Sequence, residues 1–273
     1  MKIACIGSGN MRSALMRGAA KVVGGSNITF TDSDPQKAQA AAQAVGGMFC
    51  DSNSVAMSES DFVFLAVKPQ VISDVLKEIS SVVSERYISS NPVILVSMAA
   101  GWAIEKIQGC LNFDGDKKNP VVRIMPNTPS LIGQGVIAMS SSPEVSAEKI
   151  RELEEMLSAC GIVDVIDERY LNAVSGLSGA GPAYVYLFIE ALADAGVRAG
   201  LSREKALMYA AQTVLGSAAL LKETGEHPAK LKDMVTSPGG LTIEGVAALE
   251  NGAFRGTVMN AVKASCEKAK LLG

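Results

Sequence analysis

Two glycines, Gly7 and Gly9, are the first residues whose spacing points to chemistry. The segment Gly7-Ser8-Gly9 joins a β-branched run, residues 2–6, to a segment with helical spacing, residues 11–22. In this context glycines permit a tight turn and a close backbone approach, and the helix start supplies unpaired N–H groups. That combination is typical of a pyrophosphate site for a dinucleotide. A plain strand-to-helix turn is the alternative, and the position directly after the first strand favours the phosphate site.

Arg12 departs from the dinucleotide pattern. The sixth position is normally a glycine or alanine, which lets the helix pack closely on the sheet. Two interpretations are open. In the one we favour, Arg12 points to solvent and Ala14 makes the close approach instead; in the other, Arg12 contacts a phosphate.

The end of the second predicted strand, Thr31-Asp32-Ser33-Asp34, is where such a fold reads the adenosine ribose. A carboxylate prefers the 2′-hydroxyl of NAD, whereas hydroxyls with a cation accept the 2′-phosphate of NADP. Asp32 and Asp34 favour NADH, while Thr31, Ser33 and Lys37 are able to take a phosphate. An aspartate just after a strand is also often a turn residue. Both cofactors therefore stay open.

A second glycine-rich segment, SPGGLT at residues 237–242, precedes a predicted helix. We expect the N–H groups of Gly240, Leu241 and Thr242 to converge on an anion such as a carboxylate. Capping of the helix by Ser237 or Thr242 is the alternative. The two adjacent glycines, which an ordinary cap does not require, favour the anion site.

The composition is that of a folded protein with two domains, since 273 residues are too many for one simple core. A net charge of -3 gives no reason to expect nucleic acid or an anionic membrane as a partner. The longest apolar stretches are strand-sized, well short of a membrane span. Five scattered cysteines without a C-x-x-C pair argue against disulfides and zinc. With no leader pattern at the N-terminus, we expect a cytoplasmic location.

Residues 1–166 alternate strand-sized runs with helix-like stretches, the pattern of a parallel sheet wrapped by helices. We predict strands at residues 2–6, 27–31, 62–66, 93–97, 121–124, 136–138 and 162–165. We predict helices at residues 11–22, 35–44, 72–83, 104–108 and 147–159. The expected fold class is α/β, with an N-terminal doubly wound Rossmann sheet as the dinucleotide-binding domain, residues 1–166.

Residues 167–273 carry no strand pattern, and we assign them to an all-α domain for substrate binding and dimerisation. Helices are predicted at residues 182–199, 203–224, 229–234, 243–250 and 254–271. The first has apolar side chains on more than one face: Val185, Leu187, Phe188, Leu192 and Val197. One subunit alone does not bury that much apolar surface, so we expect a homodimer.

Four segments resemble pyrroline-5-carboxylate reductases, and the resemblance covers essentially the whole chain. They are DFVFLAVKPQ at residues 61–70, VRIMPNTPSLIG at 122–133, GLSGAGPAY at 176–184, and SPGGLT at 237–242. Four motifs in the expected order are far more specific than the glycine loop alone. The resemblance implies NAD(P)H-dependent reduction of 1-pyrroline-5-carboxylate to L-proline. NADP(H) is the expected cofactor, with NAD(H) open, and a higher ring of dimers is open as well.

Taken with the glycine loop, the resemblance defines a set of cofactor residues at the carboxyl ends of strands, where open α/β sheets bind ligands. The alternatives are a surface ion pair for Lys68 and ordinary helix packing for Ala99 and Ala100. The expected cofactor-binding residues are Ile6, Gly7, Ser8, Gly9, Asn10, Met11, Ser33, Asn53, Ala66, Val67, Lys68, Pro69, Met98, Ala99 and Ala100.

The resemblance assigns the catalytic role to Thr242, whose hydroxyl would hydrogen-bond the ring nitrogen. The expected substrate-binding residues are Glu168, Ser237, Gly240, Leu241 and Thr242. Glu168 matches a family acid near the substrate, with a solvated glutamate early in a helix as the alternative. Met234 stands where many members carry an asparagine that meets the product, which puts that contact in doubt.

Other polar residues are expected to serve the structure. The only histidine, His227, precedes Pro228 in a predicted loop, and we interpret it as structural. Asn127 and Thr128 lie in a proline-fixed segment, 125–129, that either shapes a cleft wall or contacts ligand. No metal site is expected, because a protonated cyclic imine already accepts hydride well.

Two other functions compete with this prediction. A β-hydroxyacid dehydrogenase would also join a Rossmann domain to helices, but the lysines of the helical half do not fall in that family's pattern. A nucleotide-sensing protein without turnover would keep the fold, and the intact 237–242 segment argues against it.

Overall fold

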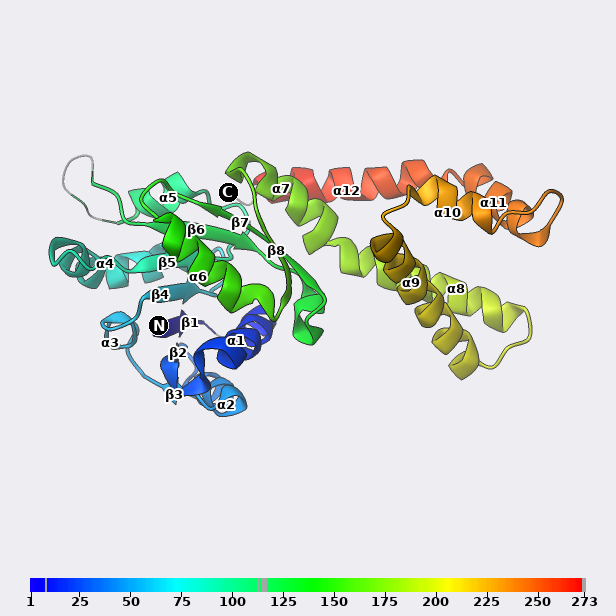
Figure 1. Ribbon diagram of the computed structural model, residues 1–273. Helices are drawn as coiled ribbons and strands as arrows, with labels where there is room; N and C mark the ends of the chain where they lie inside the picture. Colours follow the sequence, from blue (N-terminus) through cyan, green and yellow to red (C-terminus); the bar gives the residue numbers. More distant parts are fainter. Residues whose placement is uncertain (8, 112, 114–116, 272–273) are drawn as a thin grey trace. The chain divides into compact units, whose positions relative to one another are not determined.

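The computed structural model describes residues 1–7, 9–111, 113 and 117–271, and these contain one eight-stranded sheet with helices on both of its faces (Figure 1). The strand order is β3-β2-β1-β4-β5-β6-β7-β8. Neighbouring strands are parallel except for the antiparallel pair β6 and β7. The strands are β1 Ile3–Ile6, β2 Ile28–Thr31, β3 Met48–Phe49, β4 Phe62–Leu65, β5 Ile94–Ser97, β6 Val121–Met125, β7 Gly135–Ser141 and β8 Gly161–Val165.

The strand order reverses between β1 and β4, because the chain goes outward from β1 to β3 on one side and from β4 to β6 on the other. In doubly wound sheets, ligands bind at this switch point, beyond the carboxyl ends of the strands. The predicted fold class is confirmed. All seven predicted strands are present. The short edge strand β3 was not predicted, because a strand of two residues is too short to show a periodic pattern.

The helices around the sheet follow the sequence pattern with two differences. They are α1 Asn10–Val23, α2 Pro35–Val45, α3 Asn53–Met57, α4 Ile72–Ile88, α5 Ile104–Gly109 and α6 Ala147–Ser158. Helix α4 continues five residues beyond the predicted end, and the five-residue α3 was not predicted. Short 3-10 segments lie at Gly25–Asn27, Thr128–Ile132 and Glu168–Tyr170.

The sheet separates two apolar cores, because successive side chains of a strand point to opposite faces. Ile3 and Cys5 of β1 belong to one core with residues of α1, α2 and α6. Ala4 and Ile6 belong to the other, with residues of α3, α4 and α5. All four are buried, as a parallel strand covered on both faces requires. Burial raises the pKa of the Cys5 thiol to about 12, so this cysteine is an inert core residue.

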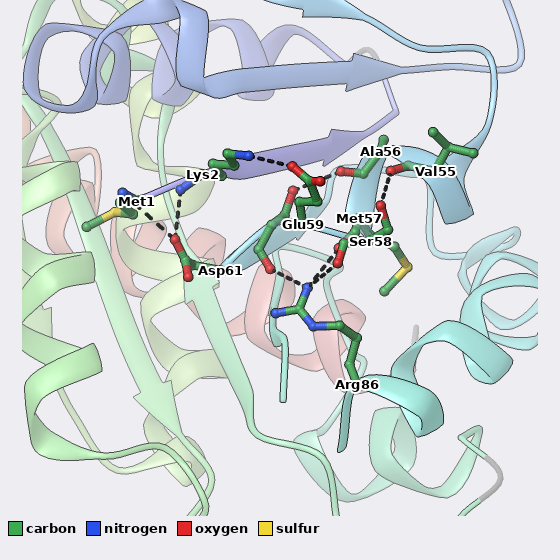
Figure 2. A network of polar contacts seen from close by, with 10 residues as sticks. Met1, Lys2, Val55, Ala56, Met57, Ser58, Glu59, Asp61 and Arg86 are labelled. Atoms are coloured by element: carbon green, nitrogen blue, oxygen red, sulfur yellow. Dashed lines mark hydrogen bonds and ion pairs between the residues drawn. The ribbon is translucent and has the colours of Figure 1, made fainter. Parts of the chain in front are cut away.

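Arg86 at the end of α4 fastens the turn between α3 and β4 to the sheet core (Figure 2). Its Nη1 donates to the carbonyls of Met57, Ser58 and Ser60 at 3.1, 2.9 and 3.0 Å, and its Nε donates to Asn91 O at 2.9 Å. The Met57 carbonyl also accepts from the Ser60 N–H at 3.1 Å, so Arg86 adds a second partner there and supplies the hydrogen bonds to the Ser58 and Ser60 carbonyls. The side chain therefore has a structural role, and one arginine replaces several backbone partners.

Beyond β8 the described chain is helical, as predicted. A short helix α7, Leu171–Val174, continues into a π-helical turn, Ser175–Gly179, and neither was predicted. The following helices are α8 Gly181–Arg198, α9 Arg203–Thr224, α10 Pro228–Met234, α11 Leu241–Asn251 and α12 Phe254–Leu271. Each of the five predicted helices matches one of these within two residues at either end. None of the helices in the described ranges is long and apolar enough to cross a membrane.

The chain divides into two compact units, Met1–Ala180 with Ser265–Gly273, and Gly181–Ala264. In the second unit, α8 and α9 pack through small residues, Ala193, Ala206 and Ala210. A Cβ at Gly196 would lie 3.0 Å from Ala206 Cβ, so the glycine allows this close packing. Small residues at a helix contact leave little apolar surface buried, and the larger side chains remain outside.

Those larger apolar side chains are exposed on both α8 and α9. Leu187 is 67 % exposed, and the other predicted α8 residues Val185, Leu192 and Val197 are exposed as well. An apolar pocket of about 420 Å³ lies between α8 and α12 within this unit, lined by Phe188, Phe254 and their neighbours. The predicted excess of apolar surface is therefore present.

Candidate active site

Gly7, directly after β1, packs against Ala66, directly after β4. Its φ is 101°, a conformation that favours glycine, and a Cβ there would lie 2.6 Å from Ala66 O. The Gly7 N–H donates to Thr31 O of β2 at 2.9 Å, and the Ala66 N–H donates to Ile6 O at 2.8 Å. This glycine is required by the close approach of two chain segments at the switch point.

The helix start beyond the loop is open for an anion. Gly9 is the residue before α1, and no side chain in the described part of the chain caps the helix there. The first N–H groups of a helix have no partner within it, and they carry the positive end of the helix dipole. Ser8 lies outside the described residues, and Met11 is half-buried in the first turn. The backbone geometry thus fits the pyrophosphate of a dinucleotide.

The ends of β4 and β5 bring further predicted cofactor residues to the same edge of the sheet. β1 pairs with β4, and β4 pairs with β5, so Ala66 and Met98 directly follow neighbouring strands. Ala66, Val67, Pro69, Met98 and Ala100 are half-buried, Ala99 is buried and Lys68 is exposed. Lys68 does not take part in the ion pairs found among the described residues, so the alternative of a surface ion pair is not supported.

The ribose-reading turn after β2 uses its carboxylates in local structure. Asp32 Oδ1 accepts from the Asp34 N–H at 2.9 Å and from the Ser33 hydroxyl at 3.4 Å. Asp34 caps α2 through the Gln36 N–H at 3.1 Å and pairs with Lys37 at 3.3 Å. Both aspartates are therefore turn and cap residues in this structure. Ser33 is exposed at the same turn.

Asn53 is fixed by a hydrogen-bond relay that the sequence did not reveal. Thr31 Oγ1 of β2 donates to Asn53 Oδ1 at 2.5 Å, and Asn53 Nδ2 donates to both carboxylate oxygens of Glu78 on α4 at 3.1 Å. The relay decides which way the amide faces. It joins residues 22 and 25 positions apart, a separation at which no local sequence signal exists.

Arg12 does not point to solvent, so the orientation we favoured is wrong. Its side chain is buried at 2 % exposure, Nη1 donates to Gly7 O at 2.7 Å, and Cζ lies 5.2 Å from the centroid of the Phe30 ring. The guanidinium finds a carbonyl and an aromatic face inside the fold, which is why the long side chain turns inward. Ala14 is buried as well.

Glu168 is not the solvated glutamate of the alternative interpretation. Its Oε1 pairs with Arg123 Nη1 at 2.6 Å and accepts from the Ile104 N–H, at the start of α5, at 2.8 Å. Arg123 lies on β6, so this carboxylate joins β6, α5 and the segment after β8. A partly buried ion pair that also meets a helix start is held firmly in place.

The second glycine-rich segment forms a tight turn into α11. Gly240 donates its N–H to Ser237 O at 3.1 Å, and a Cβ on Gly240 would lie 2.3 Å from Ser237 Oγ. The expectation that the Gly240 N–H would bind an anion is therefore wrong for this conformation. Among the described residues, no hydrogen-bond partner is found for the N–H groups of Leu241 and Thr242, the first two residues of α11. No side chain caps this helix, so capping by Ser237 or Thr242 is not observed.

Three other residues have clear places. His227 is the cap of α10, where Nδ1 accepts from the Ala229 N–H at 3.2 Å, so its structural interpretation is confirmed. Asn127 is buried. Its Nδ2 donates to Ser178 and its Oδ1 accepts from the Val136 N–H, so it is a loop-shaping residue. Met234 is 72 % exposed at the end of α10.

Comparisons with known proteins identify the family. A pyrroline-5-carboxylate reductase from Glycine max is 40 % identical over 269 residues, covering 98 % of this chain and 94 % of that protein. The chain belongs to the pyrroline-5-carboxylate reductase family. The Escherichia coli (strain K12) pyrroline-5-carboxylate reductase is 38 % identical over 274 residues, covering 99 % of this chain and 98 % of that protein.

Family models and solved structures agree with this membership in the pyrroline-5-carboxylate reductase family. The model described as pyrroline-5-carboxylate reductase dimerisation matches residues 168–272, and the one described as NADP oxidoreductase coenzyme F420-dependent matches residues 2–101. The crystal structure of Plasmodium falciparum pyrroline carboxylate reductase with NADP bound has a TM-score of 0.88 at 34 % identity. It covers 100 % of this chain and 98 % of that one. The chain is thus an oxidoreductase with a family fold over its full length.

Gly7→Ala should abolish measurable NADPH binding or weaken it by about tenfold or more, because the added Cβ would push apart the loop and the Ala66 carbonyl. Gly46→Ala is the matched control. Gly46 also has a positive φ, 69°, but a Cβ there meets nothing within 4 Å. The control should lose about 1 kcal/mol of stability and keep its NADPH affinity. Equal affinities in a fluorescence titration of both variants would exclude the loop as the binding site.

Proposed function

We propose that this protein reduces 1-pyrroline-5-carboxylate to L-proline with NADPH, the last step of proline biosynthesis. The observation that supports this most strongly is about 40 % identity to pyrroline-5-carboxylate reductases over nearly the whole chain. Fold alone would not specify the substrate. The uncapped start of α11 beside a tight glycine turn adds a site of the right chemistry for a small carboxylate.

The residues at the carboxyl edge of the sheet fit a nicotinamide dinucleotide. We place the glycine loop, residues 7–9, and the start of α1 around the pyrophosphate. We place Ser33 and the fixed amide of Asn53 on the ribose side. The segments 66–69 and 98–100 would hold the nicotinamide end. When bound, the reduced nicotinamide supplies the hydride that the imine carbon accepts. The full set is Ile6, Gly7, Ser8, Gly9, Asn10, Met11, Ser33, Asn53, Ala66, Val67, Lys68, Pro69, Met98, Ala99 and Ala100.

The state of the ribose-reading turn supports NADP(H) as the cofactor. A carboxylate that selects NAD must be free to accept from the 2′-hydroxyl. Here Asp32 Oδ1 and Asp34 Oδ1 accept from backbone N–H groups and Asp34 Oδ2 pairs with Lys37, so Asp32 Oδ2 is the one oxygen of these two carboxylates without a partner among the described residues. Ser33 and Lys37 are exposed beside them and suit a phosphate. NADH is then the weaker alternative, and the turn would have to rearrange to prefer it.

For the substrate, we assign the carboxylate to the N–H groups of Leu241 and Thr242, with Ser237 and Gly240 shaping the turn. The Thr242 hydroxyl would hydrogen-bond the ring nitrogen and hold its proton in place while the carbon is reduced. A protonated imine carries its own positive charge, so no stronger acid is needed. Glu168 is retained as a substrate-side acid, and its rigid pairing with Arg123 suits a fixed negative charge.

The exposed apolar faces of α8 and α9 support a homodimer. Apolar residues gathered over a continuous face are unfavourable in water and are typical of an obligate interface. The match of residues 168–272 to a dimerisation model supports the same assignment. We further propose the functional division into residues 1–166 and 167–273, a cytoplasmic location, and, as an open extension, a ring of dimers.

The direct test follows absorbance at 340 nm with purified full-length protein, 1-pyrroline-5-carboxylate, and NADPH or NADH in parallel. We expect rapid oxidation with NADPH and slower oxidation with NADH. Folded protein that binds NADPH but oxidises neither cofactor with this substrate would contradict the proposed reaction. In that case a different cyclic imine, a carbonyl substrate or a sensor role would take its place.

Thr242→Val should lower kcat by roughly 10²-fold, because it removes the hydroxyl while conserving shape. NADPH affinity should stay the same, and so should stability, since Thr242 does not cap α11. Thr242→Ser keeps the hydroxyl and should recover most of the lost rate. The measurement is steady-state kinetics with both substrates, and an unchanged kcat in the valine variant would remove Thr242 from the mechanism.

Leu187→Glu should convert the dimer to monomer and abolish turnover, because it places a charge on the most apolar exposed face of α8. Ile88→Glu is the control. Ile88 is 77 % exposed at the end of α4, and a charge there should change neither association nor activity. Sedimentation velocity at assay concentration distinguishes the species. A fully active wild-type monomer would disprove the dimer.

A further inference from the structure

Arg12 combines four features that an ordinary structural arginine does not require. It occupies a position where the dinucleotide pattern takes a glycine or alanine, and it is 2 % exposed. Its Nη1 donates to Gly7 O, in the loop itself, at 2.7 Å. Its Nε is buried and has no hydrogen-bond partner among the described residues.

Arg12 has no carboxylate within ion-pair distance among the described residues, although the charge of Asp32, in the turn after β2, acts on it and favours its protonated form. The ion pairs formed within the described part of the chain do not include Arg12. Its guanidinium contacts the Phe30 ring and a carbonyl, which satisfy the group only in part. Burial lowers the pKa of Arg12, yet arginine stays protonated in proteins. A buried, unpaired cation is unfavourable, and an anion placed beside it relieves that cost.

The position of the hydrogen bond between Arg12 and Gly7 indicates which anion would bind near Arg12. The peptide of Gly7 is held on both sides, since its N–H donates to Thr31 O at 2.9 Å and its carbonyl accepts from Arg12. Both contacts fix the first glycine of the loop that would receive the pyrophosphate. The 2′-phosphate would lie instead at the turn after β2, where Asp32 acts on Arg12 through its charge but Arg12 makes no hydrogen bond among the described residues.

Resting on the proposed function, we propose that Arg12 is a positioning residue for the pyrophosphate of the dinucleotide. Its bond holds Gly7, the first glycine of the loop, in place. Its buried charge lies on the protein side of that loop and is offset when the pyrophosphate binds on the other side. At this position the chain thus has a fixed cation in place of the usual small residue.

The test is the Kd of NADPH and of NADH, measured by fluorescence titration with the full-length protein. Arg12→Gln should raise both values by roughly tenfold and to a similar extent, because both cofactors carry the pyrophosphate. Arg12→Lys keeps the charge but not the forked geometry, and should give an intermediate Kd. At saturating NADPH, kcat and the KM for 1-pyrroline-5-carboxylate should stay within about twofold of the wild type.

Arg86→Ala provides the matched control, since Arg86 is also a buried arginine that donates to backbone carbonyls. It should lower the thermal midpoint without changing either Kd. If Arg12→Gln does not fold, the lysine variant decides, and it should still raise both Kd values about threefold. Unchanged affinities in the folded Arg12 variants, or a loss confined to NADPH, would overturn the inference. A wild type that binds neither cofactor would overturn the proposed function itself.

Discussion

The close approach of β1 and β4 at the switch point is the constraint on which the rest of the structure depends. Parallel strands leave room for a ligand only where the chain turns away in opposite directions beyond their carboxyl ends. Here the gap is set by Gly7, whose missing side chain lets the loop lie against Ala66 O. The loop, the helix start and the segments after β4 and β5 are consequently brought to one edge of the sheet.

Buried charged side chains hold the first unit in shape. Arg86 satisfies carbonyls of the turn before β4, at the amino ends of the strands, and Arg123 pairs with Glu168. Arg12 joins the first turn of α1 to the loop at Gly7. The guanidinium groups of Arg12 and Arg86 donate to backbone carbonyls, whereas that of Arg123 pairs with a carboxylate. Rigid geometry at the edge is what a cofactor-binding site needs, since a small displacement costs affinity and rate.

The helical unit follows a different physical rule. Its helices pack through alanines and glycines, so their larger apolar side chains remain exposed in a single chain. A surface of this kind favours association, because a second copy removes it from water. The uncapped start of α11 belongs to this same unit. The proposed site for the substrate carboxylate and the proposed dimer surface would thus be built from one set of helices.

The sequence by itself determined the elements and their class. Alternation of β-branched runs with helical stretches predicted all seven main strands, and glycine and proline punctuation predicted the five helices after residue 180 within two residues. These properties are local, since period and turn residues act over a few neighbours. The glycine loop and the 237–242 segment were found for the same reason, and so was the excess of apolar surface on α8.

Only the tertiary structure decided which polar groups are engaged, because those partners lie far apart in the chain. Arg12 was expected in solvent, but Phe30 and Gly7 draw it inward. The Gly240 N–H was expected to be free, but the turn directs it to Ser237 O. Asn53 meets Glu78, and Glu168 meets Arg123, over separations that no sequence period encodes. Local pattern fixes where a helix or strand forms, whereas the fate of a buried charge depends on which partners the fold places beside it.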